Sequence, residues 1–311
     1  MRFAIIGAGG IGGQLAVRLA LAGGEVSVVA RGRHLAAIQE SGLTLRTPDE
    51  EVRAELPAAD HGRDLPGMGP GDVVIFAVKG QDLEGSMAVA EPLMANGAYA
   101  LPMLNGVEAT DVLAARYGAD RALIGIARVG AFIAEPGVVV QNTPFARYTI
   151  GTADGGQSAP VIVEVRRRFE AAGITALDHP DLRVDLWQKF AMLTALSGTT
   201  AGARCDARTV GGSPALSALY HRLAREVVAL GRARGVPLSE TLADEALSFV
   251  QKASPGIRSS MSYDLEAGKP LELDWLNGAV ARLAAESGVD VPAHATVAAL
   301  LEPFKAGRPL R

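Results

Sequence analysis

The sequence predicts an α/β N-terminal domain, with a doubly wound and mainly parallel sheet, followed by an all-α C-terminal domain. Three observations lead to this fold class. Short apolar runs alternate with helical segments as far as residue 177, which is typical of a parallel sheet. The first apolar run enters a glycine-rich turn. Beyond residue 181 the apolar spacing is helical almost throughout.

The length of 311 residues allows two domains. We place the boundary in the polar turn Asp178-His179-Pro180-Asp181, which gives domains of residues 1–179 and 180–311. The position of His179 beside a proline favours a structural role over an acid–base role. The single cysteine, Cys205, excludes an internal disulfide and fits a reducing compartment. We expect it to be structural.

Composition and charge exclude several classes of protein. A formal net charge of −4, with no basic patch interleaved with aromatic residues, argues against nucleic-acid binding. No uncharged apolar run reaches the length of about 18 residues that a membrane span needs. The N-terminal residues indicate a buried strand and not a signal peptide. We therefore expect a cytoplasmic protein, and we predict no metal site.

The first motif joins a strand, a glycine-rich turn and a helix. Residues 2–6 form a short, largely apolar run and residues 14–20 have helical spacing. Between them lies Gly7-Ala8-Gly9-Gly10-Ile11-Gly12. In such a motif Gly7 permits the tight turn, Gly9 lets the backbone approach a pyrophosphate, and Gly12 permits close helix–strand packing. The pattern predicts a dinucleotide-binding Rossmann domain, and a glycine-rich turn without a ligand is the alternative. The candidate cofactor-binding residues here are Gly7, Gly9, Gly10, Ile11 and Gly12.

The second strand, residues 25–30, ends in Ala30 and is followed by Arg31-Gly32-Arg33. An NAD site usually carries an acid near this point for the ribose hydroxyls. This segment has no carboxylate, and two guanidinium groups can clamp a 2′-phosphate. The sequence therefore favours NADP, with a solvated basic turn as the alternative.

Two further strands end in polar residues. The run at residues 72–78 is followed by Lys79, and the run at residues 99–104 by Asn105-Gly106. Ligands of doubly wound sheets bind outside the carboxyl ends of the strands, so both side chains are candidates for the cofactor or substrate site. An ordinary charged strand cap and an ordinary turn are the alternatives. Further strands are predicted at residues 122–126, 137–141, 148–151 and 174–177, with a helix at 161–171.

The second half predicts helices over residues 182–201, 214–234, 239–251, 258–267 and 272–287. Lys189 interrupts an apolar face of the first of these, formed by Leu182, Leu186, Leu193 and Leu196. A buried ammonium needs a partner or a lowered pKa, and a reductase needs a proton donor for its carbonyl substrate. A lysine whose amine extends to water is the alternative.

Two acids and a serine complete the candidate site. Ser260 and Asp264 are four residues apart and share one helix face. Glu272 opens a predicted helix whose apolar stripe continues through Leu276, so it is a plausible partner for Lys189. Its other explanation is that it complements the helix dipole. A cleft between a Rossmann domain and a helical domain is a usual location for such a site.

The motifs in this order resemble those of the ketopantoate reductase (2-dehydropantoate 2-reductase) family, nearly end to end. They are Gly7-Ala8-Gly9-Gly10-Ile11-Gly12, Val78-Lys79, Asn105-Gly106, Trp187-Gln188-Lys189, Ser259-Ser260-Met261-x-x-Asp264, and Gly268-Lys269-Pro270-Leu271-Glu272-Leu273-Asp274 with Asn277-Gly278. The resemblance implies NADPH-dependent reduction of a 2-oxo acid, as in pantothenate biosynthesis. It also implies that Lys189 is the proton donor and that Glu272 engages this lysine and the substrate. Lys79 and Asn105 would line the nicotinamide and substrate cleft, and Ser260 would bind substrate.

One departure from the family pattern concerns the substrate pocket. Where the family places asparagines four and eight residues after its lysine, this chain has Leu193 and Ser197. Leucine cannot bond a substrate hydroxyl, and a buried hydroxyl without a partner costs about 1–3 kcal/mol. The change predicts a more apolar pocket, and a substrate that is either ketopantoate or a less polar relative.

Two other hypotheses are compatible with the fold. A non-catalytic NADP-binding regulator could keep the fold, although it would need neither Lys189 nor Glu272. A 3-hydroxy acid or opine dehydrogenase would share the two-domain plan but not the spacing of Ser260, Asp264 and Glu272. The expected partner is a small 2-oxo acid, and a homodimer is left open.

Overall fold

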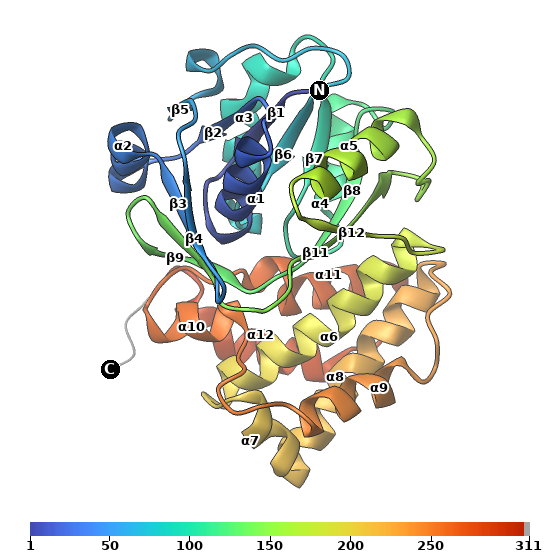
Figure 1. The fold of residues 1–311 in the computed structure, drawn as a ribbon. Coiled ribbons are helices and arrows are strands. Elements are labelled where there is room, and N and C mark those ends of the chain that lie inside the picture. The colour runs from blue at the N-terminus through green and yellow to red at the C-terminus, as the bar shows by residue number, and fades with distance from the viewer. Residues whose placement is uncertain (308–311) are drawn as a thin grey trace. The chain divides into compact units, whose positions relative to one another are not determined.

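The computed structural model describes residues 1–307 and divides into two compact units (Figure 1). The first contains Met1–Leu104 and Glu108–Leu182, and the second contains Asn105–Val107 and Arg183–Arg311. The division after Leu182 lies three residues beyond the boundary expected from the sequence. The sequence contained no signal that Asn105–Val107 would belong with the helical unit.

The first unit is built on a parallel sheet of the order β5-β2-β1-β6-β7. Its strands are β1 (Phe3–Ile6), β2 (Val26–Val29), β5 (Ala58–Ala59), β6 (Val73–Phe76) and β7 (Tyr99–Pro102). The chain runs outward from β1 to β2 and β5, then returns to the other side for β6 and β7. This reversal beside β1 is the point at which doubly wound sheets bind their ligands. The predicted Rossmann-like fold is confirmed.

Helices cover this sheet. They are α1 (Gly10–Leu21), α2 (Gly32–Ser41), α3 (Leu83–Met94), α4 (Ala109–Tyr117) and α5 (Pro160–Ala171), with 3-10 turns η1 (Gly62–Asp64) and η2 (Gly80–Asp82). Every residue of β1, β2 and β6 is buried. This burial explains why these strands are almost entirely apolar runs in the sequence.

Two smaller sheets complete the first unit. One has the order β4-β3-β10-β9 and the other β12-β11-β8. Their strands are β3 (Leu43–Arg46), β4 (Glu51–Ala54), β8 (Leu123–Arg128), β9 (Ala131–Glu135), β10 (Val138–Gln141), β11 (Arg147–Thr152) and β12 (Thr175–Leu177). The strands expected after residue 120 are thus present, but they pair partly antiparallel and outside the main sheet. Strands β3, β4, β5 and β9 and helices α2, α3 and α4 were not predicted. Much of the surface of β4, β9 and α2 is polar or exposed, which weakens the apolar pattern in the sequence.

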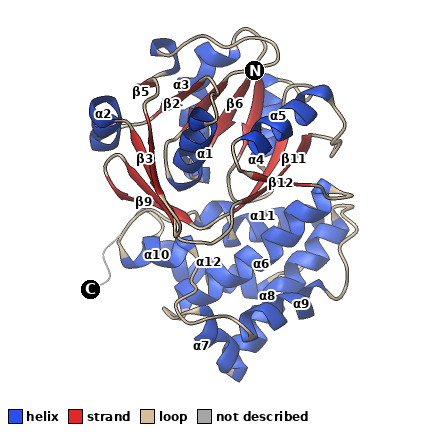
Figure 2. Ribbon diagram, viewed as in Figure 1, coloured by secondary structure: helices blue, strands red, loops and turns tan. Residues whose placement is uncertain are grey.

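The second unit, within the described residues, contains helices and no strand (Figure 2). They are α6 (Leu182–Gly202), α7 (Ala207–Gly212), α8 (Pro214–Ala233), α9 (Leu242–Gln251), α10 (Ser260–Glu266), α11 (Asn277–Ser287) and α12 (Pro292–Leu301), with 3-10 turns η3 (Leu273–Trp275) and η4 (Glu302–Phe304). The unit has its own apolar core. In residues 1–307, no helix is both long and apolar enough to span a membrane.

The helix expected at residues 272–287 is shorter than predicted. Glu272 precedes the 3-10 turn η3, and α11 begins only at Asn277. The break lies at Leu276, whose backbone angles (φ −117°, ψ −105°) are far from helical values. The buried stripe through Leu276, Val280 and Leu283 is as predicted.

Candidate active site

Three polar side chains of the second unit form a hydrogen-bonded row, although they come from distant parts of the chain. Lys189 Nζ donates to Asn105 Oδ1 at 3.2 Å. The amide of Asn105 in turn donates from Nδ2 to Glu272 Oε2 at 3.4 Å. Asn105 thus lies between a cationic and an anionic group and offers the correct end of its amide to each.

The packing of α6 directs Lys189 to this row. Trp187 is buried, lies edge-on to Phe190 with ring centroids 5.8 Å apart, and approaches Gly231 of α8 so closely that a Cβ there would lie 3.0 Å from its ring. Lys189 is two residues further along, about 200° around the helix. The side of α6 that Trp187 buries is therefore not the side that carries Lys189. The lysine is half-buried and has a protein partner, so it is not a side chain that reaches only water.

The segment Asn105–Val107 is held against η3 by a close backbone approach. Gly106 has φ +96°, and a Cβ on it would lie 3.0 Å from the Trp275 carbonyl oxygen. A side chain at this position would be strained by the positive φ angle and by its close contact with Trp275. Since Trp275 lies three residues after Glu272, the glycine keeps Asn105 within reach of the acid.

Asn277 ties the start of α11 to α6. It is fully buried, and its Nδ2 donates to the Thr194 carbonyl oxygen at 3.1 Å. A Cβ on Gly198, one turn beyond Thr194, would lie 2.8 Å from the same nitrogen. The sequence contained Asn277-Gly278 as a motif but did not indicate this role, which depends on a contact between two helices.

Glu272 is 5% exposed and lies five residues before the first residue of α11. This separation removes the basis for the interpretation that it complements the dipole of the predicted helix, because such effects fall off within one turn. Glu272 instead accepts a hydrogen bond from Asn105.

The other predicted substrate residues lie on α6 and α10. Leu193 is partly buried and packs on the core of the second unit. Ser197 is fully buried, and its hydroxyl has no hydrogen-bond partner within residues 1–307. Ser260 is exposed at the first position of α10, and Asp264 is half-buried one turn later. The structure does not bring Ser260 into a hydrogen bond with Lys189, Asn105 or Glu272 among the described residues.

The glycine-rich loop of the first unit has the geometry that a pyrophosphate needs. Gly7 has φ +98°, and a Cβ on Gly12 would lie 2.0 Å from the Gly7 carbonyl oxygen, so helix and strand are in close contact. A Cβ on Gly9 would meet no atom of residues 1–307 within 4 Å. The first turn of α1 has no side-chain cap. Open space beside uncapped N–H groups fits a phosphate group.

Arg31 and Arg33 lie at the start of α2, with Arg31 as its N-cap residue and both side chains exposed. Arg31 Nη2 is 3.6 Å from Asp82 Oδ1, in an ion pair with 78% of the arginine exposed. Lys79 is half-buried at the N-cap of η2, after the carboxyl end of β6. The two arginines are therefore accessible to a ligand phosphate.

Two residues that the sequence assigned to structural roles have surroundings typical of such roles. His179 Nδ1 lies 2.6 Å from the Asp181 carbonyl oxygen, inside its own turn. Burial raises the pKa of the Cys205 thiol, which disfavours the reactive thiolate. Among the described residues no group of three or more His, Cys, Asp and Glu side chains could hold a metal ion.

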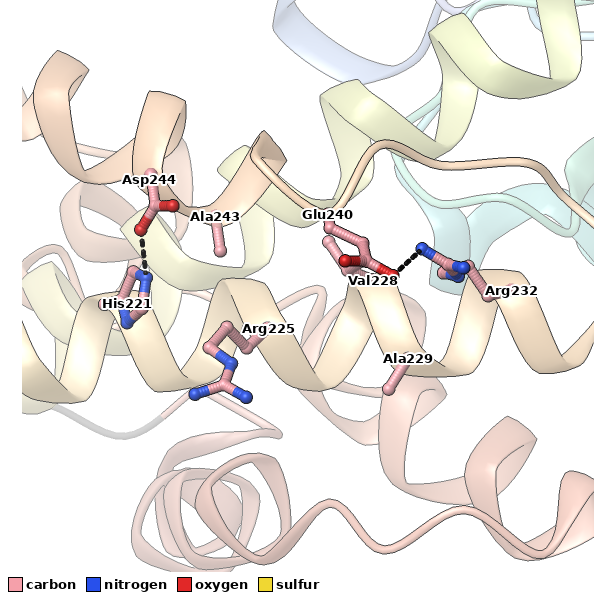
Figure 3. Close-up of a pocket in the computed structure, with 8 residues that line it drawn as sticks. All are labelled: His221, Arg225, Val228, Ala229, Arg232, Glu240, Ala243 and Asp244. Carbon is pink, nitrogen blue, oxygen red and sulfur yellow. Dashed lines mark hydrogen bonds and ion pairs between the residues drawn. The ribbon is translucent and has the colours of Figure 1, made fainter.

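A separate hollow of about 720 Å³ lies along α8 and the start of α9 (Figure 3). Its polar side chains include two ion pairs, His221 with Asp244 at 2.8 Å and Arg232 with Glu240 at 2.9 Å. None of the residues predicted for the site lines it.

Comparison with known proteins finds similarity to ketopantoate reductases over most of the chain. Residues 3–155 match the family model described as ketopantoate reductase PanE/ApbA, and residues 181–305 match its C-terminal counterpart. A 2-dehydropantoate 2-reductase of Halobacterium salinarum is 30% identical over 304 residues, covering 97% of this chain and 98% of the relative. A PanE/ApbA family ketopantoate reductase from Ralstonia eutropha JMP134 superposes with a TM-score of 0.88, at 28% identity and 98% coverage of both chains. A D-mandelate dehydrogenase solved with NADH and anilino(oxo)acetate has the same fold, with a TM-score of 0.88 at 19% identity and 98% coverage of both chains.

Proposed function

The chain belongs to the ketopantoate reductase family, whose members are oxidoreductases acting on CH–OH groups, and on this premise we propose that it reduces a 2-oxo acid to the 2-hydroxy acid with NADPH. The single observation that carries the proposal is the Lys189–Asn105–Glu272 row. It supplies a proton donor, an orienting amide and a carboxylate in one unit.

In the proposed reaction the protein supplies the proton. The chemistry that NADPH provides when bound is donation of a hydride to the carbonyl carbon. As negative charge develops on the carbonyl oxygen, the Lys189 ammonium transfers a proton to it, which completes the hydroxyl group and leaves a neutral amine. Asn105 keeps the amine in one orientation, and Glu272 favours its charged form between turnovers. The amine is then reprotonated from solvent.

The direct test is NADPH consumption with a panel of 2-oxo acids, with and without a hydroxymethyl branch. We expect the absorbance of NADPH to fall with at least one branched 2-oxo acid and the matching 2-hydroxy acid to accumulate. NADPH binding with no turnover of any 2-oxo acid would instead favour the non-catalytic regulator, which has no support among the reductase relatives. Turnover of 3-hydroxy acids or of an amine with a 2-oxo acid would favour the other dehydrogenase classes.

The preference for NADPH rests on Arg31 and Arg33. Both are exposed at the start of α2, where a 2′-phosphate could accept hydrogen bonds from each guanidinium. Loss of such a contact costs about 1.5–3 kcal/mol, so NADPH should bind roughly ten- to a hundredfold more tightly than NADH. Equal dissociation constants for the two cofactors in parallel titrations would reject this assignment.

The substrate is proposed to be ketopantoate or a less polar relative. Leu193 lies one helical turn from Lys189 on α6, at the position where the family pattern has an asparagine. Ser197 follows one turn later and is closed to solvent in this conformation. An apolar group at Leu193 favours an alkyl substituent over a hydroxymethyl group on the same wall. Ser260 and Asp264 remain proposals as substrate-binding residues.

A further inference from the structure

We propose that His34 is a positioning residue for the cofactor, which holds the pyrophosphate loop and the start of α2 in one arrangement; this inference rests on the proposed NADPH dependence. His34 lies on α2, one residue after Arg33. Its Nε2 is 2.8 Å from the Ala8 carbonyl oxygen, and its Nδ1 is 3.0 Å from the Gly137 nitrogen. Neither contact was indicated by the sequence.

The two contacts determine the form of the ring. A backbone N–H can only donate, so Nδ1 must accept from Gly137 and carries no proton. Nε2 then carries the proton and donates it to Ala8. His34 is therefore a neutral imidazole whose Nε2 donates to Ala8 and whose Nδ1 accepts from Gly137.

The bond to Ala8 sets the direction of a peptide group inside the glycine-rich loop. In a trans peptide the carbonyl and the following N–H point in opposite directions. With its carbonyl bonded to His34, the Ala8–Gly9 peptide must direct the Gly9 N–H away from α2. Gly9 is the loop residue whose Cβ position is open. His34 thus orients the N–H at the place where space for a pyrophosphate exists.

The bond to Gly137 connects the same ring to the β9–β10 hairpin. Gly137 has φ +79° between the two strands, and a Cβ on it would lie 3.1 Å from Ala37 of α2. The start of the same hairpin approaches the loop, since a Cβ on Gly10 would lie 2.1 Å from the Ala131 carbonyl oxygen. The loop, the hairpin and α2 therefore meet around His34.

This junction spans the two places proposed to bind phosphate. The loop would hold the pyrophosphate, and Arg31 and Arg33 would hold the 2′-phosphate. Both arginines are exposed, long and flexible, so their separation from the loop depends on where α2 begins. By bonding Ala8 from α2, His34 sets that separation without touching the cofactor.

The test compares three variants of His34 with a control on the same helix. His34→Ala removes both contacts. His34→Gln offers one amide donor and one acceptor at the same reach. His34→Asn reaches only the place of Nδ1 and so retains the Gly137 contact alone. The control is Gln39→Ala, because Gln39 also joins α2 to a backbone carbonyl, that of Ala58 at 2.9 Å, but away from the loop.

We expect the dissociation constant for NADPH, measured by fluorescence titration, to rise about tenfold in His34→Ala and in His34→Asn. At saturating NADPH, kcat should change less than about twofold. His34→Gln should recover most of the affinity, and Gln39→Ala should match the wild type. If His34→Ala does not fold, the comparison of His34→Asn with His34→Gln decides the question.

The outcomes separate the two proposals. Unchanged NADPH affinity in His34→Asn and His34→Ala, or equal losses in all three His34 variants, would overturn the positioning role while the reductase proposal stands. A loss in Gln39→Ala equal to that in His34→Ala would also overturn it, because the effect would then be a general loosening of α2. A wild-type protein that binds neither NADPH nor NADH would overturn the proposed function and this inference together.

Discussion

Two of the acid–base groups in the second unit differ in how their members are connected. In the Lys189–Asn105–Glu272 row the amide of Asn105 is hydrogen-bonded to both the cation and the carboxylate, and the lysine is half-buried. In the other group Glu226 of α8 contacts His294 of α12 directly, with Oε2 and Nδ1 3.0 Å apart and the histidine 0% exposed.

The Glu226–His294 group satisfies the start of a helix. Glu226 accepts from the Ala293 and His294 backbone N–H groups, both at 2.9 Å, in the first turn of α12. Burial opposes ionisation of Glu226, but the hydrogen bonds from His294 and from these N–H groups outweigh it and lower the pKa. The carboxylate therefore acts as an internal cap for α12.

The difference supports the proposal that the Lys189–Asn105–Glu272 row, and not the Glu226–His294 group, performs the chemistry. A catalytic proton donor must reach a ligand and exchange protons with solvent, and a half-buried lysine meets this requirement. A structural pair gains most from complete burial and direct contact. The two groups should therefore respond in opposite ways to mutation.

The largest expected effect is on turnover. Lys189→Ala should lower kcat at least about a hundredfold, because it removes the proposed general acid, while NADPH binding and the melting temperature stay close to wild type. Lys252→Ala, at an exposed lysine after α9, is the matched control. Glu272→Ala should also be impaired, and its effect should not add to that of Lys189→Ala if the two act as a unit. A fully active Lys189→Ala enzyme would refute the assignment.

The second prediction concerns Glu226. Glu226→Ala leaves two helix N–H groups and a buried histidine without their acceptor, so the free energy of unfolding should fall by about 2 kcal/mol. Activity per folded molecule should be retained. Chemical denaturation with parallel kinetics measures both quantities, with Glu245→Ala, on the neighbouring α9, as the control. If Glu226→Ala lowered kcat without lowering the free energy of unfolding, Glu226 would have a catalytic and not a structural role.

The third prediction concerns Leu193, which lies one helical turn from Lys189 and is proposed to set the substrate preference. Burying the extra methyl of an apolar substrate against Leu193 favours that substrate by roughly 0.8 kcal/mol. Leaving the hydroxyl of ketopantoate without a hydrogen-bond partner disfavours ketopantoate by about 1–3 kcal/mol. The wild type should therefore prefer a branched apolar 2-oxo acid over ketopantoate tens-fold in kcat/KM, and Leu193→Asn should narrow that gap. A higher kcat/KM for ketopantoate than for its deoxy analogue would show that the pocket is not altered in this sense.

The smallest expected effect is a dependence of stability on pH. Burial lowers the pKa of His294, an effect that contact with Glu226 only partly offsets. Between the lowered pKa of His294 in the folded protein and its ordinary value, the unfolded chain therefore binds a proton that the folded protein does not bind. The free energy of unfolding should therefore reach its full value above about pH 6.5, the ordinary pKa of histidine, and should fall as the pH drops below it. In His294→Asn the melting temperature should vary less between about pH 7.5 and pH 5.5, roughly one unit on either side of that value. An unchanged dependence of the melting temperature on pH would contradict the assignment.

The sequence alone was sufficient for features that depend on neighbours along the chain. The glycine-rich turn, four of the five strands of the main sheet and the apolar stripe that contains Lys189 all follow from short-range spacing, because local backbone geometry imposes it. The fifth strand, β5, was not predicted. The same spacing misplaced the start of the helix at Glu272, since the backbone of Leu276 follows from packing and not from periodicity.

Only the tertiary structure decided which distant residues meet. Asn105 joins Lys189 to Glu272 across separations of 84 and 167 residues, and His34 joins Ala8 to Gly137. A hydrogen bond requires its two atoms to lie within about 3 Å, a condition that no spacing along the chain expresses when the partners lie on different elements. Sequence therefore determined the kinds of groups available to this protein, and packing determined their partners.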